Sequence, residues 1–156
     1  MKSSRQLTSD ASLDTAEVLD HKLIRHLAWF RYHLRQFLRF SENAARAAGI
    51  TPQQHQLLLG VAGHTGGGWA TIGELAEFLQ ERHNAVVGLV ERAARRGLVH
   101  KRPGERDRRF VCVHLTPRAE GLLTQLSRLH RAEAGRLVSR VLKASAPMGT
   151  SVRRRR

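Results

Sequence analysis

A helix with two opposed faces, followed by two short strands around an arginine-rich turn, constrains this fold more than any other feature. The pattern spans residues 82–122. The helix is expected over 83–96 and to stop at Gly97, since glycine readily adopts the left-handed conformation that ends many helices. Strands are expected at 99–102 and 110–115. A helix beside such a hairpin suits a reader of double-stranded DNA, with the helix in the major groove and the hairpin against phosphates or the minor groove.

The helical period of 3.6 residues separates a core face from an exposed face of this helix. The side chains expected in the core are Val86, Leu89, Val90 and Ala93. The opposite face carries Asn84, Val87, Gly88, Glu91 and Arg95. An asparagine can bond an adenine edge, Val87 can contact a thymine methyl, and His83 can reach a base or a phosphate. The alternative is an ordinary solvent-exposed surface.

Several residues are therefore candidates for DNA contact. Those on or beside the helices are Thr71, Arg82, His83, Asn84, Val87, Gly88 and Arg95. Those in the hairpin turn are Arg106, Asp107, Arg108 and Arg109. For the turn the alternative is a solvated charged loop, because exposed charges are usually just hydrated.

The charge balance favours a polyanionic partner. The chain has 156 residues, with 27 Lys and Arg against 13 Asp and Glu, and a net charge of +14. Nearly all the basic residues are arginines, which suit planar, bidentate contacts with phosphates and guanine edges. Nucleic acid is the first partner to consider and an acidic membrane the second. The alternative is a surface whose charge serves only solubility.

Apolar periodicity and capping signals organise the chain around this central unit. Helices are expected at about 13–48, 51–62, 71–80 and 117–143. Thr51 with Gln54, and Thr71 with Glu74, have the spacing of capping boxes, and Gly49 is placed to end the first helix. Residues 1–12 and the arginine-rich tail 145–156 are expected to be disordered. Residues 13–144 form one domain, with a DNA-binding lobe at 51–115.

The fold class expected is mainly α (α+β), a winged helix-turn-helix with a two-stranded wing and long terminal helices. Both terminal helices, 13–48 and 117–143, carry an apolar residue every three or four positions. These positions are Leu23, Leu27, Phe30 and Leu34 in the first helix and Leu122, Leu126, Leu129, Leu137 and Val141 in the last. Seams of this kind are usually buried, and a second copy of the chain is the simplest partner.

Several of these segments resemble one known family. They are Leu75-Ala76-Glu77-Phe78-Leu79, Val86-x-x-Leu89-Val90-Glu91-Arg92, Arg95-Arg96-Gly97-Leu98-Val99, Asp107-Arg108-Arg109, and Leu115-Thr116-Pro117 with Leu122. Together they look like the helix-turn-helix, the wing and the start of the dimerisation helix of MarR-type transcription regulators. The resemblance implies a homodimeric repressor or activator, often released from its operator by a small molecule or an oxidant.

The resemblance also implies that Asp107 orients Arg109, which leaves Arg106 and Arg108 for the DNA backbone or the minor groove. The chain departs from the family pattern in three places. Gln80 stands at a turn position often held by glycine, Arg82-His83-Asn84 replaces the polar run that often opens the recognition helix, and Gly88 occupies an often basic position. The operator sequence therefore stays open.

Other chemistries have weaker support. Cys112 is the single cysteine, which predicts no disulfide framework and a structural residue rather than an oxidant sensor. The nine histidines show no compact ligand spacing, so solvated or interfacial histidines are favoured over a metal sensor. The glycine run 66–68 lacks the Lys-Ser/Thr of a phosphate-binding loop. We expect no cofactor, no metal, no membrane segment and no enzymatic activity.

The sequence thus predicts a homodimeric DNA-binding transcription regulator, cytoplasmic and nucleoid-associated. We expect a repressor that recognises a pseudo-palindromic operator, with a small-molecule effector as the means of release. The first alternative is an architectural DNA-binding protein without sequence preference, consistent with the net charge of +14. The second is a winged helix used for binding other proteins, which predicts little affinity for DNA at physiological salt.

Overall fold

The computed structural model describes residues 20–63, 67–104 and 110–145. Its elements, in chain order, are α1 (His21–Ala47), α2 (Pro52–Gly63), β1 (Trp69–Thr71), α3 (Ile72–Leu79), α4 (His83–Arg95), β2 (Val99–Pro103), β3 (Val111–Leu115) and α5 (Pro117–Ser145). The expected disordered ends, and residues 13–19 of the expected first helix, lie outside the described residues. Mostly helical with a small antiparallel sheet, the chain has the expected fold class.

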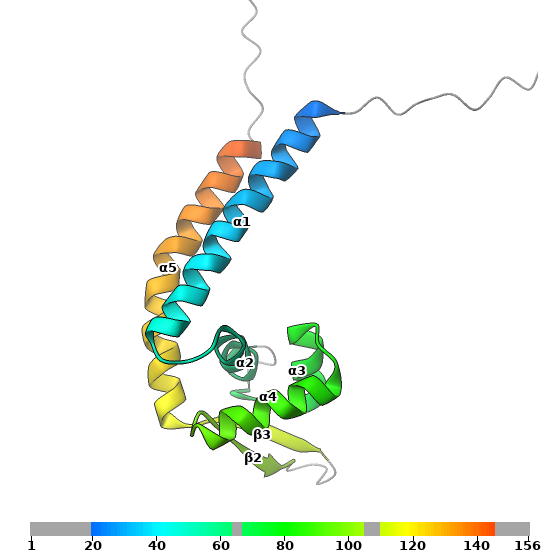
Figure 1. Ribbon diagram of the computed structural model, residues 1–156, viewed down its shortest axis with the longest axis vertical. Coiled ribbons are helices and arrows are strands. Elements are labelled where there is room, and N and C mark those ends of the chain that lie inside the picture. The colour runs from blue at the N-terminus through cyan, green and yellow to red at the C-terminus, as the bar shows by residue number, and fades with distance from the viewer. Residues whose placement is uncertain (1–19, 64–66, 105–109, 146–156) are drawn as a thin grey trace, which may run out of the picture.

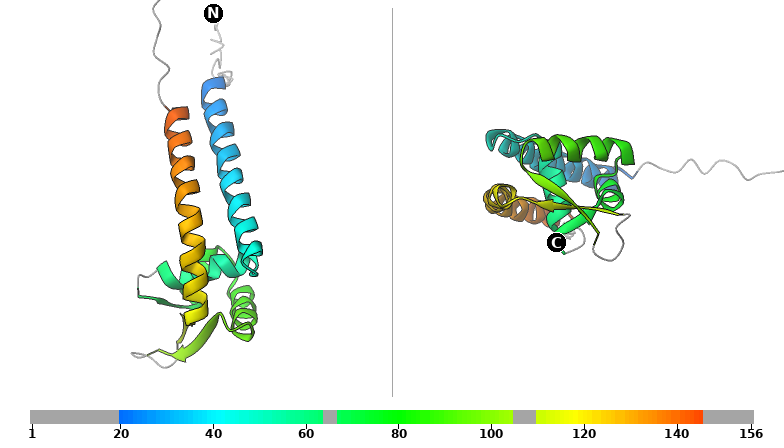
Figure 2. Two further views of the ribbon diagram at one scale, coloured as in Figure 1. Left: turned by 90° about the vertical axis from the view of Figure 1, so that its left-hand side faces the viewer. Right: turned by 90° about the horizontal axis from the view of Figure 1, so that it is seen from below.

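Two long helices form a stalk, and the remaining elements form a lobe at one end of it (Figure 1). α1 and α5 lie side by side and run in opposite directions, as a second view confirms (Figure 2). α1 begins at His21, later than its apolar periodicity predicted, because Asp20 is its N-cap. The Asp20 carboxylate accepts the backbone N–H groups of Lys22 and Leu23 at 2.9 and 3.0 Å, which satisfies donors that would otherwise lack a partner.

Glycines in the left-handed conformation end α1 and α4, as predicted. Gly49 has φ +79° and Gly97 has φ +67°. After α1, the N–H of Gly49 donates to the carbonyl of Arg46 at 3.0 Å and the N–H of Ile50 to that of Ala45 at 3.1 Å. This is a Schellman motif, and the same pair of bonds closes α4 around Gly97. These stops turn the chain from the stalk into the lobe, and from α4 into β2.

Both predicted capping boxes are present. At the start of α2, the N–H of Thr51 donates to Oε1 of Gln54 at 3.0 Å, and the N–H of Gln54 donates to Oγ1 of Thr51 at 3.1 Å. At the start of α3, the N–H of Thr71 donates to Oε2 of Glu74 at 2.7 Å, and the N–H of Glu74 to Oγ1 of Thr71 at 3.3 Å. Each box satisfies two helix-terminal donors and fixes where the helix begins.

The sheet consists of the two predicted wing strands, β2 and β3, and a third strand, β1, that was not predicted. Its order is β1-β3-β2, with both pairings antiparallel. Trp69 pairs with His114 on one side of β3, and His100 pairs with His114 on the other. β1 was missed because a three-residue strand after a glycine run has too few side chains to show an alternating pattern. It joins the wing to the start of α3.

The core of the lobe is built around α2, which lies between the stalk and the helix pair α3–α4 (Figure 1). A Cβ built on Gly60 of α2 would lie 2.8 Å from Cδ1 of Phe78, so a larger residue there would force the Phe78 side chain of α3 to shift. The predicted core face of α4 is confirmed. The buried apolar side chains include Leu57, Leu58, Val61, Leu75, Val86, Leu89, Val90, Ala93, Leu98, Val113 and Leu126. Each fully buried large aliphatic chain contributes roughly 1.5–3 kcal/mol.

None of the described helices has the length and the apolar character needed to span a membrane.

Candidate nucleic-acid interface

The face of α4 opposite its core side is exposed at both ends of the helix. Arg82, His83 and Asn84 are exposed at its start, and Arg95 is exposed at its end. Arg82 is the N-cap and makes no side-chain capping hydrogen bond. The first turn of α4 therefore presents backbone N–H groups and the positive end of the helix dipole outward, an arrangement that favours a phosphate.

Val87 and Gly88 are half-buried, so this part of the reading face is recessed. A Cβ built on Gly88 would lie 3.2 Å from Nη1 of Arg92. The Arg92 guanidinium therefore leans over Gly88 and supplies a positive charge near a position that the family often fills with a basic residue. Sequence reasoning missed this role, because Arg92 follows Gly88 by one helical turn and only its extended side chain brings the charge back.

The turn between α3 and α4 closes with a Schellman motif centred on Gln80. The N–H of Gln80 donates to the carbonyl of Glu77 at 3.1 Å and the N–H of Glu81 to that of Ala76 at 3.0 Å. Gln80 has φ +54°, and among the described residues it is the one non-glycine with positive φ. Its backbone thus takes the conformation of the glycine often found at this turn, at a steric cost of about 1 kcal/mol.

Thr71 lies at the other end of α3, where β1 ends. Its hydroxyl donates to Oε2 of Glu74 at 2.9 Å and accepts the Glu74 N–H. Thr71 is half-buried. The capping box therefore already engages the hydroxyl that the sequence suggested for DNA contact.

The base of the wing is well formed. Arg102 pairs with Cys112 across β2 and β3, and the N–H of Gly104 donates to the carbonyl of Phe110 at 2.9 Å. The predicted wing residues Arg106, Asp107, Arg108 and Arg109 lie outside the described residues. Lys101 and Arg102 of β2 are exposed and add positive charge that the sequence analysis did not single out. Cys112 itself is buried.

An arginine at the end of α4 ties the lobe to the stalk. Nη2 of Arg96 donates to the carbonyl of Gly49 at 2.7 Å, and Nη1 donates to Oε1 of Gln54 at 3.2 Å. The carbonyl of Arg96 accepts from Nη1 of Arg118 at 2.9 Å, and the Thr116 hydroxyl donates to the carbonyl of Gly97 at 2.8 Å. These bonds connect α4 with the start of α2 and the start of α5, and so fix the direction in which α4 points.

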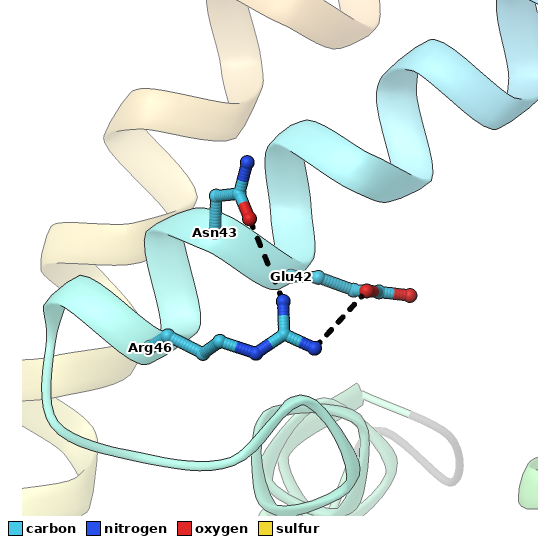
Figure 3. A network of polar contacts seen from close by, with 3 residues as sticks. All are labelled: Glu42, Asn43 and Arg46. Atoms are coloured by element: carbon cyan, nitrogen blue, oxygen red, sulfur yellow. Dashed lines mark hydrogen bonds and ion pairs between the residues drawn. The ribbon is translucent and has the colours of Figure 1, made fainter.

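A cavity of about 380 Å³ lies where α1, α2 and α4 meet. Its walls are mainly apolar, with polar groups from each helix. The lining residues are Leu38, Ser41, Glu42, Pro52, Gln53, His55, Gln56, Leu79, Glu81, Ala85, Val86, Leu89 and Arg92. Arg46 orients Glu42 at the edge of this cavity: its guanidinium donates to Glu42 at 3.3 Å and to Asn43 at 3.5 Å (Figure 3).

The predicted dimerisation residues fall into three groups. Leu23, Leu27, Phe30 and Leu129 are exposed on the stalk. Leu34, Leu122, Leu137 and Val141 are half-buried. Leu126 is fully buried in the hydrophobic core of the single chain, so it is a core residue and not part of an exposed seam. Ile24, Leu38, Val138 and Leu142 extend the exposed apolar surface.

In the part of the chain that the structure describes, no three His, Cys, Asp or Glu side chains come together as a metal site.

Comparison with known proteins finds one family. Residues 48–109 match the sequence model of the MarR family. The transcriptional activatory protein BadR of Rhodopseudomonas palustris is 29% identical over 117 residues, which cover 74% of this chain. That match spans 65% of BadR, less than two thirds of its length.

Two solved structures illustrate the likeness in fold. A MarR family protein from Bacillus stearothermophilus has a TM-score of 0.64 and 20% identity, covering 77% of this chain and 82% of its own. An S. aureus MepR–DNA complex has a TM-score of 0.58 and 22% identity, covering 70% of this chain and 79% of the MepR chain. At such identities the likeness establishes the shared fold.

Proposed function

We propose, from the match of residues 48–109 to the sequence model of the MarR family, that the protein is a homodimeric, DNA-binding transcription regulator. In this proposal α4 of each copy enters a major groove of a pseudo-palindromic operator, and the wing contacts the flanking backbone. The observation that carries the proposal is the division of α4 into a fully buried core face and an exposed face. A helix held this firmly by one face can present the other without changing its own structure.

The chemistry of the exposed face supports sequence reading. Asn84 can donate to and accept from an adenine edge at once, and Val87 offers a methyl contact to thymine. The uncapped first turn and the exposed Arg82 and Arg95 favour the phosphates on either side. Phosphate contacts would set the position of the helix, and the amide would supply the preference for a base.

A second copy of the chain would associate with the first through the stalk. The exposed apolar side chains on α1 and α5 cover several turns of both helices, and such surfaces mark association sites in soluble proteins. A two-fold axis through the stalk would repeat α4 and place the half-sites about one helical turn, roughly 10 bp, apart. The stalk would then act as the dimerisation element.

We place effector control at the cavity between stalk and lobe. The cavity borders Val86 and Leu89 on the core side of α4, and it also borders Leu38 and Ser41 of α1. A ligand held there would contact both parts, so it could change the angle at which α4 leaves the stalk. A repressor released by a small molecule would work in this way.

The experiment that tests the proposal is a selection of duplexes from a random library, followed by titrations at two salt concentrations. We expect a symmetric site whose half-sites are about 10 bp apart, and a specific affinity about a thousandfold or more above that for scrambled DNA. Equal affinity for selected and scrambled duplexes would contradict sequence-specific regulation. Failure to bind either duplex at physiological salt would favour a protein-interaction role.

A further inference from the structure

Two imidazole rings are in contact at the joint between stalk and lobe. His55 of α2 and His130 of α5 have ring centroids 5.1 Å apart, with 36° between the ring planes. From α1, the rings of Phe37 and Phe40 meet His130 edge-on, with centroids at 6.0 and 5.6 Å. The pair therefore lies where both stalk helices contact the central helix of the lobe.

Hydrogen bonding fixes the proton on one of these rings. Nδ1 of His130 lies 2.5 Å from the carbonyl oxygen of Leu126. Because a carbonyl only accepts, Nδ1 must carry the hydrogen, and Nε2 of the neutral ring keeps a free lone pair. That Nε2 is buried, with no hydrogen-bond partner among the described residues. The lone pair of this nitrogen therefore lies in a buried position without a donor from the described residues.

The surroundings of His55 disfavour a charge as well. His55 is 2% exposed. Burial, and then the neighbouring His130, lower the pKa of His55 below its ordinary value of 6.5. The charged side chains around the cavity that His55 lines are Glu42 of α1, Glu81 of the α3–α4 turn and Arg92 of α4. Arg46 forms an ion pair with Glu42. The negative charge of Glu42 is therefore partly neutralised by a residue other than the two histidines.

We propose that His55 and His130 form a proton-binding site at this joint, and that proton uptake there loosens the lobe from the stalk and weakens DNA binding. The part of this inference that concerns DNA binding rests on the proposed function. A charged imidazole in this apolar setting is more stable when water reaches it. Protonation therefore favours an opened joint, in which the angle between α4 and the stalk is no longer fixed.

The sign follows from proton linkage. The opened joint binds protons more readily than the closed one, so the closed joint is fully stable above pH about 6.5 and loses stability as the pH falls below that value.

The test compares the wild-type protein with His130→Phe, which keeps an aromatic ring beside Phe37 and Phe40 and removes both imidazole nitrogens. His55→Phe is a second variant, for which the adjoining cavity offers space. His21→Phe, at an exposed position in the first turn of α1, removes an imidazole elsewhere and is the control. The dissociation constant for the selected duplex is measured from pH about 7.5 to about 5.5.

We expect the wild type and the control to lose affinity below pH about 6.5, by up to about tenfold per unit of pH for each proton taken up. The joint variants should have flatter profiles. Parallel profiles for the wild type and both joint variants would overturn the proposal.

A measurement without DNA keeps the two proposals distinguishable. The melting temperature of the wild type should fall more steeply below pH about 6.5 than that of His55→Phe, because this variant lacks the buried imidazole whose pKa is lowered. If no duplex is bound specifically at any pH, the proposed function fails, while this difference still supports the proton site. Equal falls in melting temperature would remove the proton site whatever the DNA result.

Discussion

Asn84 is the side chain on which the proposed base recognition depends most directly. It is exposed and lies opposite the buried Val86 and Leu89, so Asn84→Ala should not unfold the protein. If the amide reads an adenine, the variant should lose about 1–3 kcal/mol per half-site on the selected operator. Scrambled DNA should be bound almost as before, because phosphate contacts dominate that interaction. Titration of both duplexes measures the difference, and equal losses would remove Asn84 from the reading face.

The turn between α3 and α4 requires Gln80 to adopt a left-handed backbone conformation, which costs stability. Replacing it with glycine should raise the free energy of unfolding by about 0.5–1 kcal/mol, because glycine adopts φ +54° without a Cβ clash. Gln80→Ala is the matched control: it shortens the side chain but keeps the Cβ, so it should bring no gain. Urea denaturation measures both. The same stability for the glycine and alanine variants would show that the turn is not strained.

At the scale of the elements, most boundaries could be predicted because their signals are local. Thr51 with Gln54 and Thr71 with Glu74 lie three residues apart, and Gly49 and Gly97 directly follow their helices. The contacts that orient the lobe could not be predicted in this way. Arg96 meets Gly49 across 47 positions in the sequence, and no local pattern indicates which of several arginines will do so.

The packing of α4 against the start of α2 should depend on Arg96. Arg96→Ala removes two hydrogen bonds, and we expect a loss of about 1–2 kcal/mol in the free energy of unfolding, since part of their strength is offset by exposure. Arg95→Ala is the control, because this neighbour points to the reading face. It should leave stability nearly unchanged and weaken DNA binding. Chemical denaturation measures the stability of both variants, and duplex titration measures their affinity for DNA. Equal losses of stability would contradict the structural role of Arg96.

For the whole molecule, periodicity predicted the apolar seams but could not divide them between core and surface. Leu126 shares its spacing with Leu129, yet the lobe covers Leu126 completely and leaves Leu129 exposed. The difference depends on where α2 and the sheet contact α5. The joint at His55 and His130 was also beyond sequence reasoning, since two histidines on separate helices give no signal until the helices are packed.

The dimer proposal is tested on the exposed part of the seam. Leu27→Glu places a charge on an apolar surface that is 52% exposed in the single chain, so each chain should still fold while association weakens. Arg25→Glu, at an exposed position on the opposite side of α1 from Leu27, is the control. Light scattering at micromolar concentration should give a dimer for the wild type and Arg25→Glu, and a monomer for Leu27→Glu. A monomeric wild type would contradict the proposed assembly.

The Gln54 side chain restricts how this sequence can diverge. Its Oε1 atom accepts both the Thr51 N–H that begins α2 and the Arg96 guanidinium that holds α4. A substitution at 54 therefore disturbs two hydrogen bonds at once, and glutamate is the replacement that keeps an acceptor oxygen for both. Among descendants of this protein, positions 51, 54 and 96 should change together or not at all, while the reading face beside them remains free to acquire a new operator.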